Sequence, residues 1–239
     1  MKILLSIFVT AFYLFFTGCS ETTDSGNYAI VNIRSEMNQS TVSLAKLLNK
    51  EISIQKSEVD SLRINRVRIL LSRIKFHLES ENDSLDNQFN EGPFLFIGDS
   101  TGTYFELTNG VLNAGVYEKI KFEIHRFSSN DLSQYVNDAI FKDFATSERY
   151  SVIIEGVVYK NGIADNFTYN GTPTANLSLK FEPSIVLQAN VTKYLYLQVS
   201  PIDLLKSGNS VLDPRDTSNV NDIDNLIKAA IKAVDKKEK

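Results

Sequence analysis

Apolar and polar residues alternate along most of the chain after residue 27. The alternating stretches are rich in β-branched and aromatic residues, as in residues 28–33, 150–159, 177–181 and 194–199. A period of two places successive side chains on opposite faces of a strand, which is typical of half-buried sheets. Strands that alternate regularly with long helices are absent from the pattern. The sequence therefore predicts a mainly β fold, an antiparallel β-sandwich.

The longest predicted strand, residues 62–78, changes phase along its length. Apolar residues fall on even positions at Leu62 and Ile64, on odd positions from Val67, and on even positions again from Ile74. Such a change predicts a β-bulge or a break into two strands. Apolar residues in 59–74 also recur at spacings of three and four, so a helix is the competing prediction there. We favour the strand.

Two further segments carry local signals. Asn161-Gly162 suits the positive φ angles of a two-residue turn, so the strands at 150–159 and 167–169 are predicted to form a β-hairpin. Residues 131–144 carry apolar side chains at helical spacing and are predicted to be helical or irregular.

The chain ends in its one clear helical pattern, predicted at residues 219–236. Acidic residues lie near its start and lysines near its end, as the helix dipole favours. Apolar residues form one stripe at helical spacing: Val220, Ile223, Leu226, Ile227, Ala230, Ile231 and Val234. We expect this amphipathic helix to pack on the sandwich. The alternative is a helix that docks on a partner or on a membrane.

The first eighteen residues have the layout of an export signal. Lys2 precedes an apolar run that ends at Phe16, which is short for a membrane-spanning helix. Phe16, Thr17 and Gly18 are followed by Cys19, the only cysteine of the chain. This stretch resembles a lipobox, the cleavage and acylation site of bacterial lipoproteins, although Phe16 stands where leucine is usual.

The lipobox resemblance implies a signal peptide at 1–18, cleavage before Cys19, and acyl chains such as palmitate on that cysteine. Residues 19–26 then form the lipidated end and a polar tether, and 27–239 form one domain without disulfides. Ser20 after the cysteine resembles lipoproteins sent to the outer membrane, and either the periplasmic or the surface face is possible. An ordinary cleaved signal and an uncleaved anchor helix are the alternatives.

Two segments resemble a family of uncharacterised β-sandwich lipoprotein domains common in Bacteroidetes. Residues 113–122 (NAGVYEKIKF) match its AGxY turn and strand, and 212–214 (LDP) with the later Asn219 match its LDP…N…I tail. The resemblance implies an immunoglobulin-like or prealbumin-like topology, with Gly115 at a tight strand entry and Tyr117 in the core. It implies no activity, because the family has none agreed. The acidic metal-like tail of many relatives is missing here.

Candidate chemistry is sparse. A net charge of −4 offers no general attraction to nucleic acid. The Gly-x-Ser-x-Gly match at residues 98–102 (GDSTG) lies in a turn between two predicted strands, not at the strand-to-helix turn of a nucleophile elbow. There is also no tryptophan platform for sugars, so we expect no enzyme and no cofactor. His77 and His125 could share a metal only if their strands were neighbours in register, and we expect none bound. The acidic residues of 213–224 could bind calcium, but helix capping is the favoured use.

Four tyrosines are the candidate ligand-binding residues: Tyr159, Tyr169, Tyr194 and Tyr196. They could form a face for a glycan or protein partner, and cross-strand packing is the alternative. We expect a membrane-anchored envelope lipoprotein with a non-catalytic binding or structural role, in contact with the bilayer through Cys19. The alternative is a carbohydrate- or small-ligand-binding module serving uptake. A concave tyrosine patch would favour that module, and a free strand edge would favour assembly or partner binding.

Overall fold

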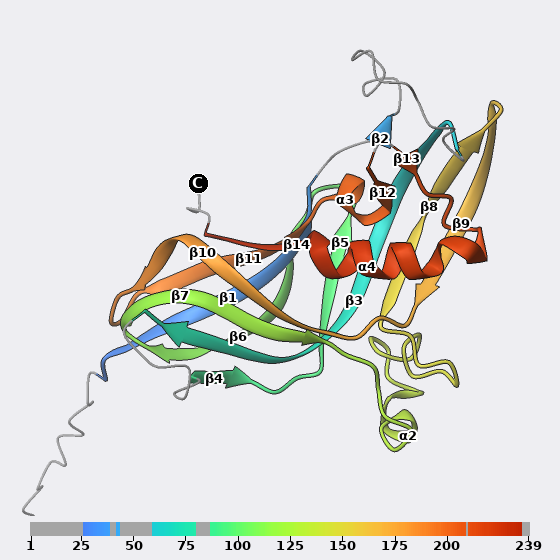
Figure 1. Cartoon of the computed structure of the whole chain (residues 1–239). Coiled ribbons are helices and arrows are strands. Elements are labelled where there is room, and N and C mark those ends of the chain that lie inside the picture. Colours follow the sequence, from blue (N-terminus) through green and yellow to red (C-terminus); the bar gives the residue numbers. More distant parts are fainter. Residues whose placement is uncertain (1–25, 39–41, 44–58, 80–86, 209, 236–239) are drawn as a thin grey trace, which may run out of the picture.

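A computed structural model describes residues 26–38, 42–43, 59–79, 87–208 and 210–235. The predicted signal peptide, its cleavage site, Cys19 and residues 20–25 lie outside the described residues. Within the described part the protein is mainly β, as predicted, with two largely antiparallel sheets and a short helix near the C-terminal end. The sheets face each other at one end of an elongated molecule, and the hairpin β8–β9 extends from the other end (Figure 1).

The smaller sheet has four strands in the order β14-β11-β1-β6. They are β14 (Ile231–Asp235), β11 (Thr192–Val199), β1 (Tyr28–Met37) and β6 (Phe105–Asn113). The pair β1–β11 is parallel, and β1–β6 and β11–β14 are antiparallel. The first strand of the domain is therefore central in its sheet.

The larger sheet follows the path β10-β7-β3-β8-β9, and three short strands also pair with β3. The path strands are β10 (Ala175–Leu187), β7 (Gly115–Ile124), β3 (Ser61–Leu78), β8 (Val152–Lys160) and β9 (Ile163–Gly171). The short strands are β2 (Val42–Ser43), β4 (Asn87–Asn90) and β5 (Phe94–Asp99).

Strand β3 organises this sheet because it changes partner along its length. Its first part pairs with β8 and its last part with β7, and the register shifts between Ser72 and Lys75. Arg73 lies at this shift with φ of 55°, a left-handed conformation that is uncommon for a residue with a Cβ. The change of phase in the sequence is thus a bulge within one long strand, and the competing helix prediction is wrong.

The core lies between the two sheets and continues under the helix α4 (Val220–Ala230). Tyr117 is fully buried in it, its hydroxyl donates to the carbonyl of Asn113 at 2.9 Å, and its ring meets Phe76 edge-on at 5.9 Å. A Cβ at Gly115 would lie 2.8 Å from Leu78 Cδ2, closer than van der Waals contact. The AGxY segment therefore has the tight strand entry and the core tyrosine that we expected.

The terminal helix is shorter than the predicted 219–236. Helix α4 ends at Ala230, and the next five residues form β14, which pairs with β11. The prediction failed there because Ile231 and Val234 also fit the pattern of a strand, and pairing with β11 gives their backbone a hydrogen-bonded partner strand. Within α4, Ile223 and Ile227 are fully buried in the core, so the expected packing on the sheets is confirmed.

The remaining local predictions are confirmed in part. Strands β8 and β9 form the hairpin, with positive φ at both Asn161 and Gly162. In 131–144 only α2 (Leu132–Tyr135) is helical, because the Asp138 side chain accepts from the N–H groups of Ile140 and Phe141 and starts a new turn. The other short elements are α3 (Pro201–Leu205), β12 (Lys206–Ser207), β13 (Ser210–Val211) and η1 (Thr217–Asn219).

Candidate functional site

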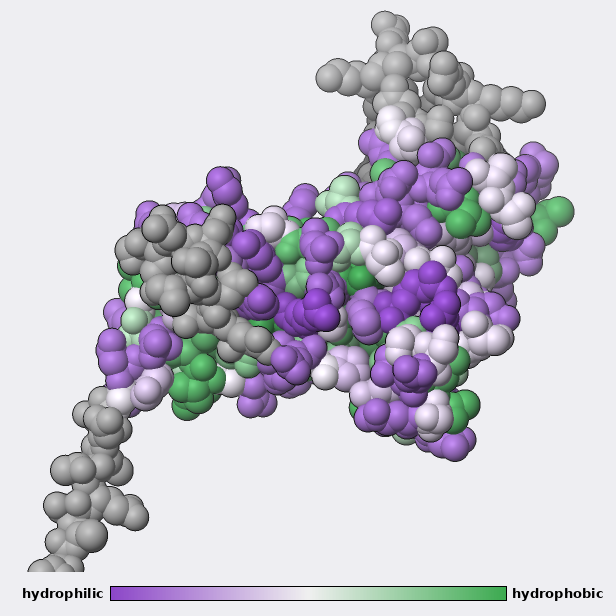
Figure 2. Space-filling view, turned by 60° about the horizontal axis from the view of Figure 1, so that its bottom comes forward, coloured by the Kyte–Doolittle hydropathy of each residue, from purple (hydrophilic) through white to green (hydrophobic). Residues whose placement is uncertain are grey.

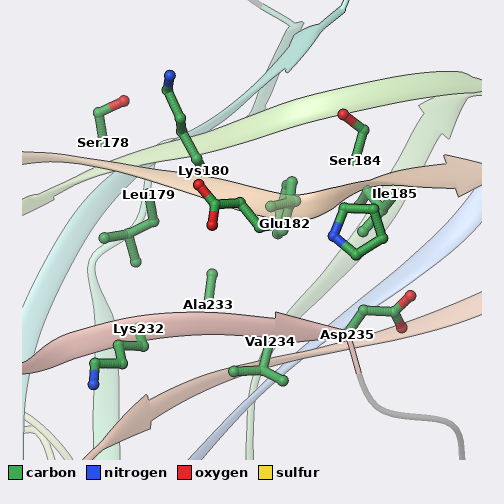
Figure 3. A pocket seen from close by; sticks show the side chains of 12 residues that line it. Ser178, Leu179, Lys180, Glu182, Ser184, Ile185, Lys232, Ala233, Val234 and Asp235 are labelled. Carbon is green, nitrogen blue, oxygen red and sulfur yellow. The ribbon is translucent and has the colours of Figure 1, made fainter.

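A groove lies between two strands that are each at the edge of one sheet. Its walls are β10 and β14, and its volume is about 570 Å³. Leu179 and Glu182 of β10 point toward Ala233 of β14 across the opening (Figure 3). In the described part of the chain, β10 pairs only with β7, and β14 pairs only with β11. Two sheet edges therefore face each other without a hydrogen-bonded ladder between them.

The sequence of β10 explains why the two edges stay apart. The strand leaves its register with β7 between Lys180 and Ile185, and this irregular stretch contains Pro183. Proline has no N–H to donate to a neighbouring strand, and bulges twist an edge away from further pairing. The free edge of β10 is thus interrupted at its centre, while the edge of β14 is regular over its short length.

The groove carries apolar and charged side chains in balance. Leu179, Ala233 and Val234 are partly buried and supply apolar surface. Of the charged side chains, Asp235 binds Lys193 Nζ at 2.6 Å outside the groove, and Lys232 Nζ lies 3.8 Å from Asp203. The groove is therefore suited to a neutral, partly apolar occupant rather than to a strongly charged one.

Two of the four candidate tyrosines meet on the outer face of the smaller sheet. We call the group formed by Arg34, Tyr104, Glu106, Tyr194 and Tyr196 the Arg34 cluster. The guanidinium carbon lies 4.1 Å from the ring centre of Tyr104 and 4.0 Å from that of Tyr194. Its Nε donates to Glu106 Oε1 at 2.7 Å, and one terminal nitrogen donates to the Tyr196 hydroxyl at 3.0 Å.

The side chains of the Arg34 cluster leave no open space for a ligand between them. The guanidinium occupies the space between the tyrosine rings, and only 7% of Arg34 is exposed. Tyr196 is buried, Tyr194 is partly buried, and Tyr104 is 46% exposed. Cation–π stacking and the ion pair therefore account for these tyrosines as parts of the sheet's outer layer. The exposed ring of Tyr104 is the part that remains accessible to a ligand.

The other two candidate tyrosines lie on the β8–β9 hairpin, on its opposite faces. Tyr159 pairs with Ala164 near the turn, whereas Tyr169 pairs with Ile154 and is buried. The Tyr169 hydroxyl donates to Asp224 Oδ1 at 2.7 Å and so links the hairpin to α4. The four tyrosines are thus divided between two places and do not make one face.

The contact between Tyr169 and Asp224 predicts a dependence of stability on pH. Burial raises the pKa of the Asp224 carboxyl, and the Tyr169 hydrogen bond only partly opposes this. An unfolded aspartate has a pKa of about 3.9. A raised folded-state pKa means that Asp224 supports folding best when protonated, and that this contribution declines as pH rises through the folded-state pKa.

We therefore expect Asp224→Asn, which keeps an oxygen acceptor for Tyr169 but cannot ionise, to gain stability relative to the unmodified protein as pH rises from about 4 to 7. Urea unfolding midpoints at both pH values measure this difference. Asp222→Asn, on the exposed side of the same helix, is the matched control. A difference between Asp224→Asn and the parent that does not change with pH would contradict the assignment.

The acidic segment before α4 is used for turns and capping. Arg215 donates to both carboxylate oxygens of Asp213, and this lowers the pKa of the Asp213 carboxyl. The Asn219 side chain donates to the Asp213 carbonyl, and Asp216 accepts from Ser218 N–H at the start of η1. The LDP…N residues therefore form one turn network. The favoured capping role is confirmed for Asp216.

The two histidines are separated although their strands are neighbours. In the β3–β7 ladder His77 lies opposite Lys119, while His125 donates its N–H to the carbonyl of Leu70. Seven positions along β3 place them on the order of 20 Å apart. Among the described residues no group of three or more His, Cys, Asp or Glu side chains is arranged to hold a metal ion.

Sequence reasoning missed the groove and the arginine at the centre of the tyrosine cluster. Glu182-Pro183 inside an alternating strand was the available signal for an interrupted edge, and the alternation after Ala230 was the signal for β14. No local signal connects Arg34 with Tyr104, because the pairing of β1 with β6 brings them together.

None of the helices in the described part of the chain has the length and apolar character needed to span a membrane.

Comparison of the chain with protein-family models, with curated proteins and with solved structures found no match. The resemblance to lipoprotein sandwich domains therefore remains a prediction from the AGxY and LDP segments.

Proposed function

We propose that this chain is a lipid-anchored lipoprotein of the cell envelope, at the outer membrane, with a non-catalytic role. Its domain binds an extended segment of a partner protein in the groove between β10 and β14. The observation that carries this proposal is the pair of sheet edges that face each other across an open groove.

The anchor is supported by the N-terminal sequence. An apolar run of signal-peptide length ends at a lipobox-like stretch whose last residue is the only cysteine of the chain. Acylation of Cys19 gives the domain a short tether to the bilayer. Two or more acyl chains on one residue suffice for stable membrane attachment.

An extended peptide suits the groove for three reasons. The edge of β14 presents backbone N–H and C=O groups that a further strand can pair with. Five residues of β14 give a ladder of about 17 Å, long enough to align a short segment. Leu179 and Val234 can make apolar contacts with alternate side chains of that segment. The positive and negative side chains of the groove are balanced, which favours a segment without net charge.

The interrupted edge of β10 determines which wall of the groove pairs with the added segment. Pro183 and the bulge prevent regular pairing along the centre of β10, so the added segment pairs with β14 and packs its side chains against β10. Partner selection then depends on the β10 side chains, and affinity depends on the β14 backbone. Enzymatic chemistry has no part in this arrangement.

Site-specific photocrosslinking in cells of the source organism tests the groove. A photoreactive amino acid placed at Lys180 or Lys232, both exposed beside the groove, should give one discrete adduct with the same partner segment. Ile163 is 69% exposed at the tip of the β8–β9 hairpin and is the control position. Adducts should be absent there.

A blocking variant gives the matched comparison. Ala233→Arg places a long charged side chain in the groove and should remove the adducts at Lys180. Ala139→Arg, the same substitution at an exposed site outside the groove, should leave them in place. Circular dichroism checks that both variants fold. Equal adducts at Ile163, or adducts at Lys180 that survive Ala233→Arg, would refute peptide binding in the groove.

A carbohydrate- or small-ligand-binding module serving uptake is the second candidate. The exposed ring of Tyr104 beside the exposed carboxylate of Glu106 favours it, because sugars stack on aromatic rings and donate to carboxylates. Glycan binding of this kind would be lost in Tyr104→Ala and unaffected by Ala233→Arg. Tyr104→Ala and Ala233→Arg therefore distinguish glycan binding from peptide binding in the groove.

A further inference from the structure

One end of the sandwich gathers three segments that are distant in sequence. We call it the N-terminal pole: residues 26–33 with the start of β1, residues 108–117 around the β6–β7 turn, and residues 184–192 around the β10–β11 turn. The register places Ile30 opposite Val111, and Asn190 donates its N–H to the carbonyl of Tyr28 at 2.7 Å. The three segments therefore meet at one end of the sandwich. Ile30 and Val111 lie on the outer face of the smaller sheet, and Val116 and Val186 pair on the outer face of the larger sheet.

The N-terminal pole exposes large apolar side chains. Six of the exposed large apolar residues of the described part lie on it, with exposed fractions from 38% to 60%: Tyr28, Ile30, Val111, Val116, Val186 and Val191. Hydrophobic surface is visible at the end of the molecule from which the grey N-terminal segment leaves (Figure 2). A surface that faces only water is ordinarily more polar than this. Exposed apolar patches mark contacts with proteins or membranes.

Charged residues border the pole at Glu79, whose N–H donates to the carbonyl of Val116, and at Lys193, which lies opposite Val31, but its three segments contain none. Residues 26–33, 108–117 and 184–192 contain no Asp, Glu, Lys or Arg, although such residues make up 23% of the chain. Their polar residues are Asn, Gln, Ser and Thr, together with the phenol of Tyr28. Uncharged groups lose little on approaching a lipid surface, whereas charged groups would have to give up hydration.

The short tether between Cys19 and the domain keeps this surface near the bilayer. Asn27 follows Cys19 by eight positions, so the fully extended tether spans at most about 29 Å. A lipid on Cys19 would therefore hold the start of β1 close to the headgroups. The tip of the β8–β9 hairpin lies at the other end of the molecule (Figure 1).

We infer that the N-terminal pole rests on the lipid surface beside the acylated cysteine, with Tyr28, Ile30, Val111 and Val191 in the headgroup region. This inference rests on the proposed lipid anchor. Tyrosine has an apolar ring and a polar hydroxyl, which suits the membrane–water interface. The pole fixes the orientation of the domain, with the β8–β9 hairpin directed away from the membrane.

The test uses the full, lipidated protein in vesicles of phosphatidylethanolamine and phosphatidylglycerol. Single substitutions Val111→Cys or Val191→Cys each provide one thiol for a nitrobenzoxadiazole label, because acylation occupies Cys19, the only native cysteine. Ile163→Cys, at an even more exposed apolar site on the hairpin tip, is the control. The measurements are the emission maximum and quenching by nitroxide-labelled lipid.

Labels at the N-terminal pole should show a blue-shifted emission and loss of fluorescence with nitroxide lipid, and the label at Ile163 should show neither. Protein that floats with the vesicles but has unquenched labels at both valines would overturn the inference and leave the anchor intact. Quenching at Ile163 instead would overturn the orientation. Protein that does not float with the vesicles would refute the anchor itself, and the inference with it.

Discussion

Ile227→Ala should lower the free energy of unfolding by about 2–5 kcal/mol, the range for emptying a buried aliphatic site. Ile227 is fully buried on the face of α4 that joins the core cluster of both sheets. Alanine would remove apolar contacts and leave a cavity that the strands around it cannot easily close. The loss is a large part of a typical domain's stability, so the urea midpoint should fall clearly.

Two variants on the same helix calibrate this result. Asn225→Ala, on the exposed side, should stay within about 0.5 kcal/mol of the parent. Leu226→Ala, which is partly buried, should fall between the other two. A value for Ile227→Ala as small as that for Asn225→Ala would mean that α4 does not belong to the core. It would then become a docking helix, the alternative that the sequence also allowed.

The sheets were predictable where one face of a strand is buried and the other is not. In β3 the apolar residues report which face points inward, so the bulge at Arg73 is visible as a change of phase. In the same way Asn161-Gly162 predicts its hairpin because the turn needs two residues with positive φ. Both signals are local, and neither depends on which strand lies next.

The end of α4 was not predictable from periodicity alone. Ile231 and Val234 fit a helical stripe and also fit a strand with mixed burial. The decision depends on the free edge of β11, a partner more than thirty residues earlier in the chain. Long-range pairing of this kind leaves little trace in a single sequence, and the predicted helix was therefore too long.

The candidate site could be predicted only in part, for the same reason. Tyr194 and Tyr196 were chosen for their type and alternation, and they do lie together on the outer face. Their partner Arg34 and the exposed Tyr104 come from strands that only the sheet order brings near. The groove depends on two edges that do not pair with each other in the described part of the chain, and a sequence contains no direct signal for a missing ladder.

The lipid anchor carries the largest expected effect. Cys19→Ser should abolish the incorporation of a labelled fatty acid completely, because serine cannot form the thioether that begins the modification. The single cysteine leaves no second acceptor thiol, so no residual label should remain. Fractionation should follow the label, because without the lipid the domain keeps no acyl chain to hold it at the membrane.

The proposed lipid anchor can be tested by mass spectrometry of the mature N-terminus of the wild-type protein, isolated from membranes of the source organism. We expect that the first residue is Cys19, that residues 1–18 are absent, and that the N-terminal peptide carries the added mass of the acyl chains. A mature chain that begins at another residue, or that begins at Cys19 without added lipid mass, would contradict the proposed anchor.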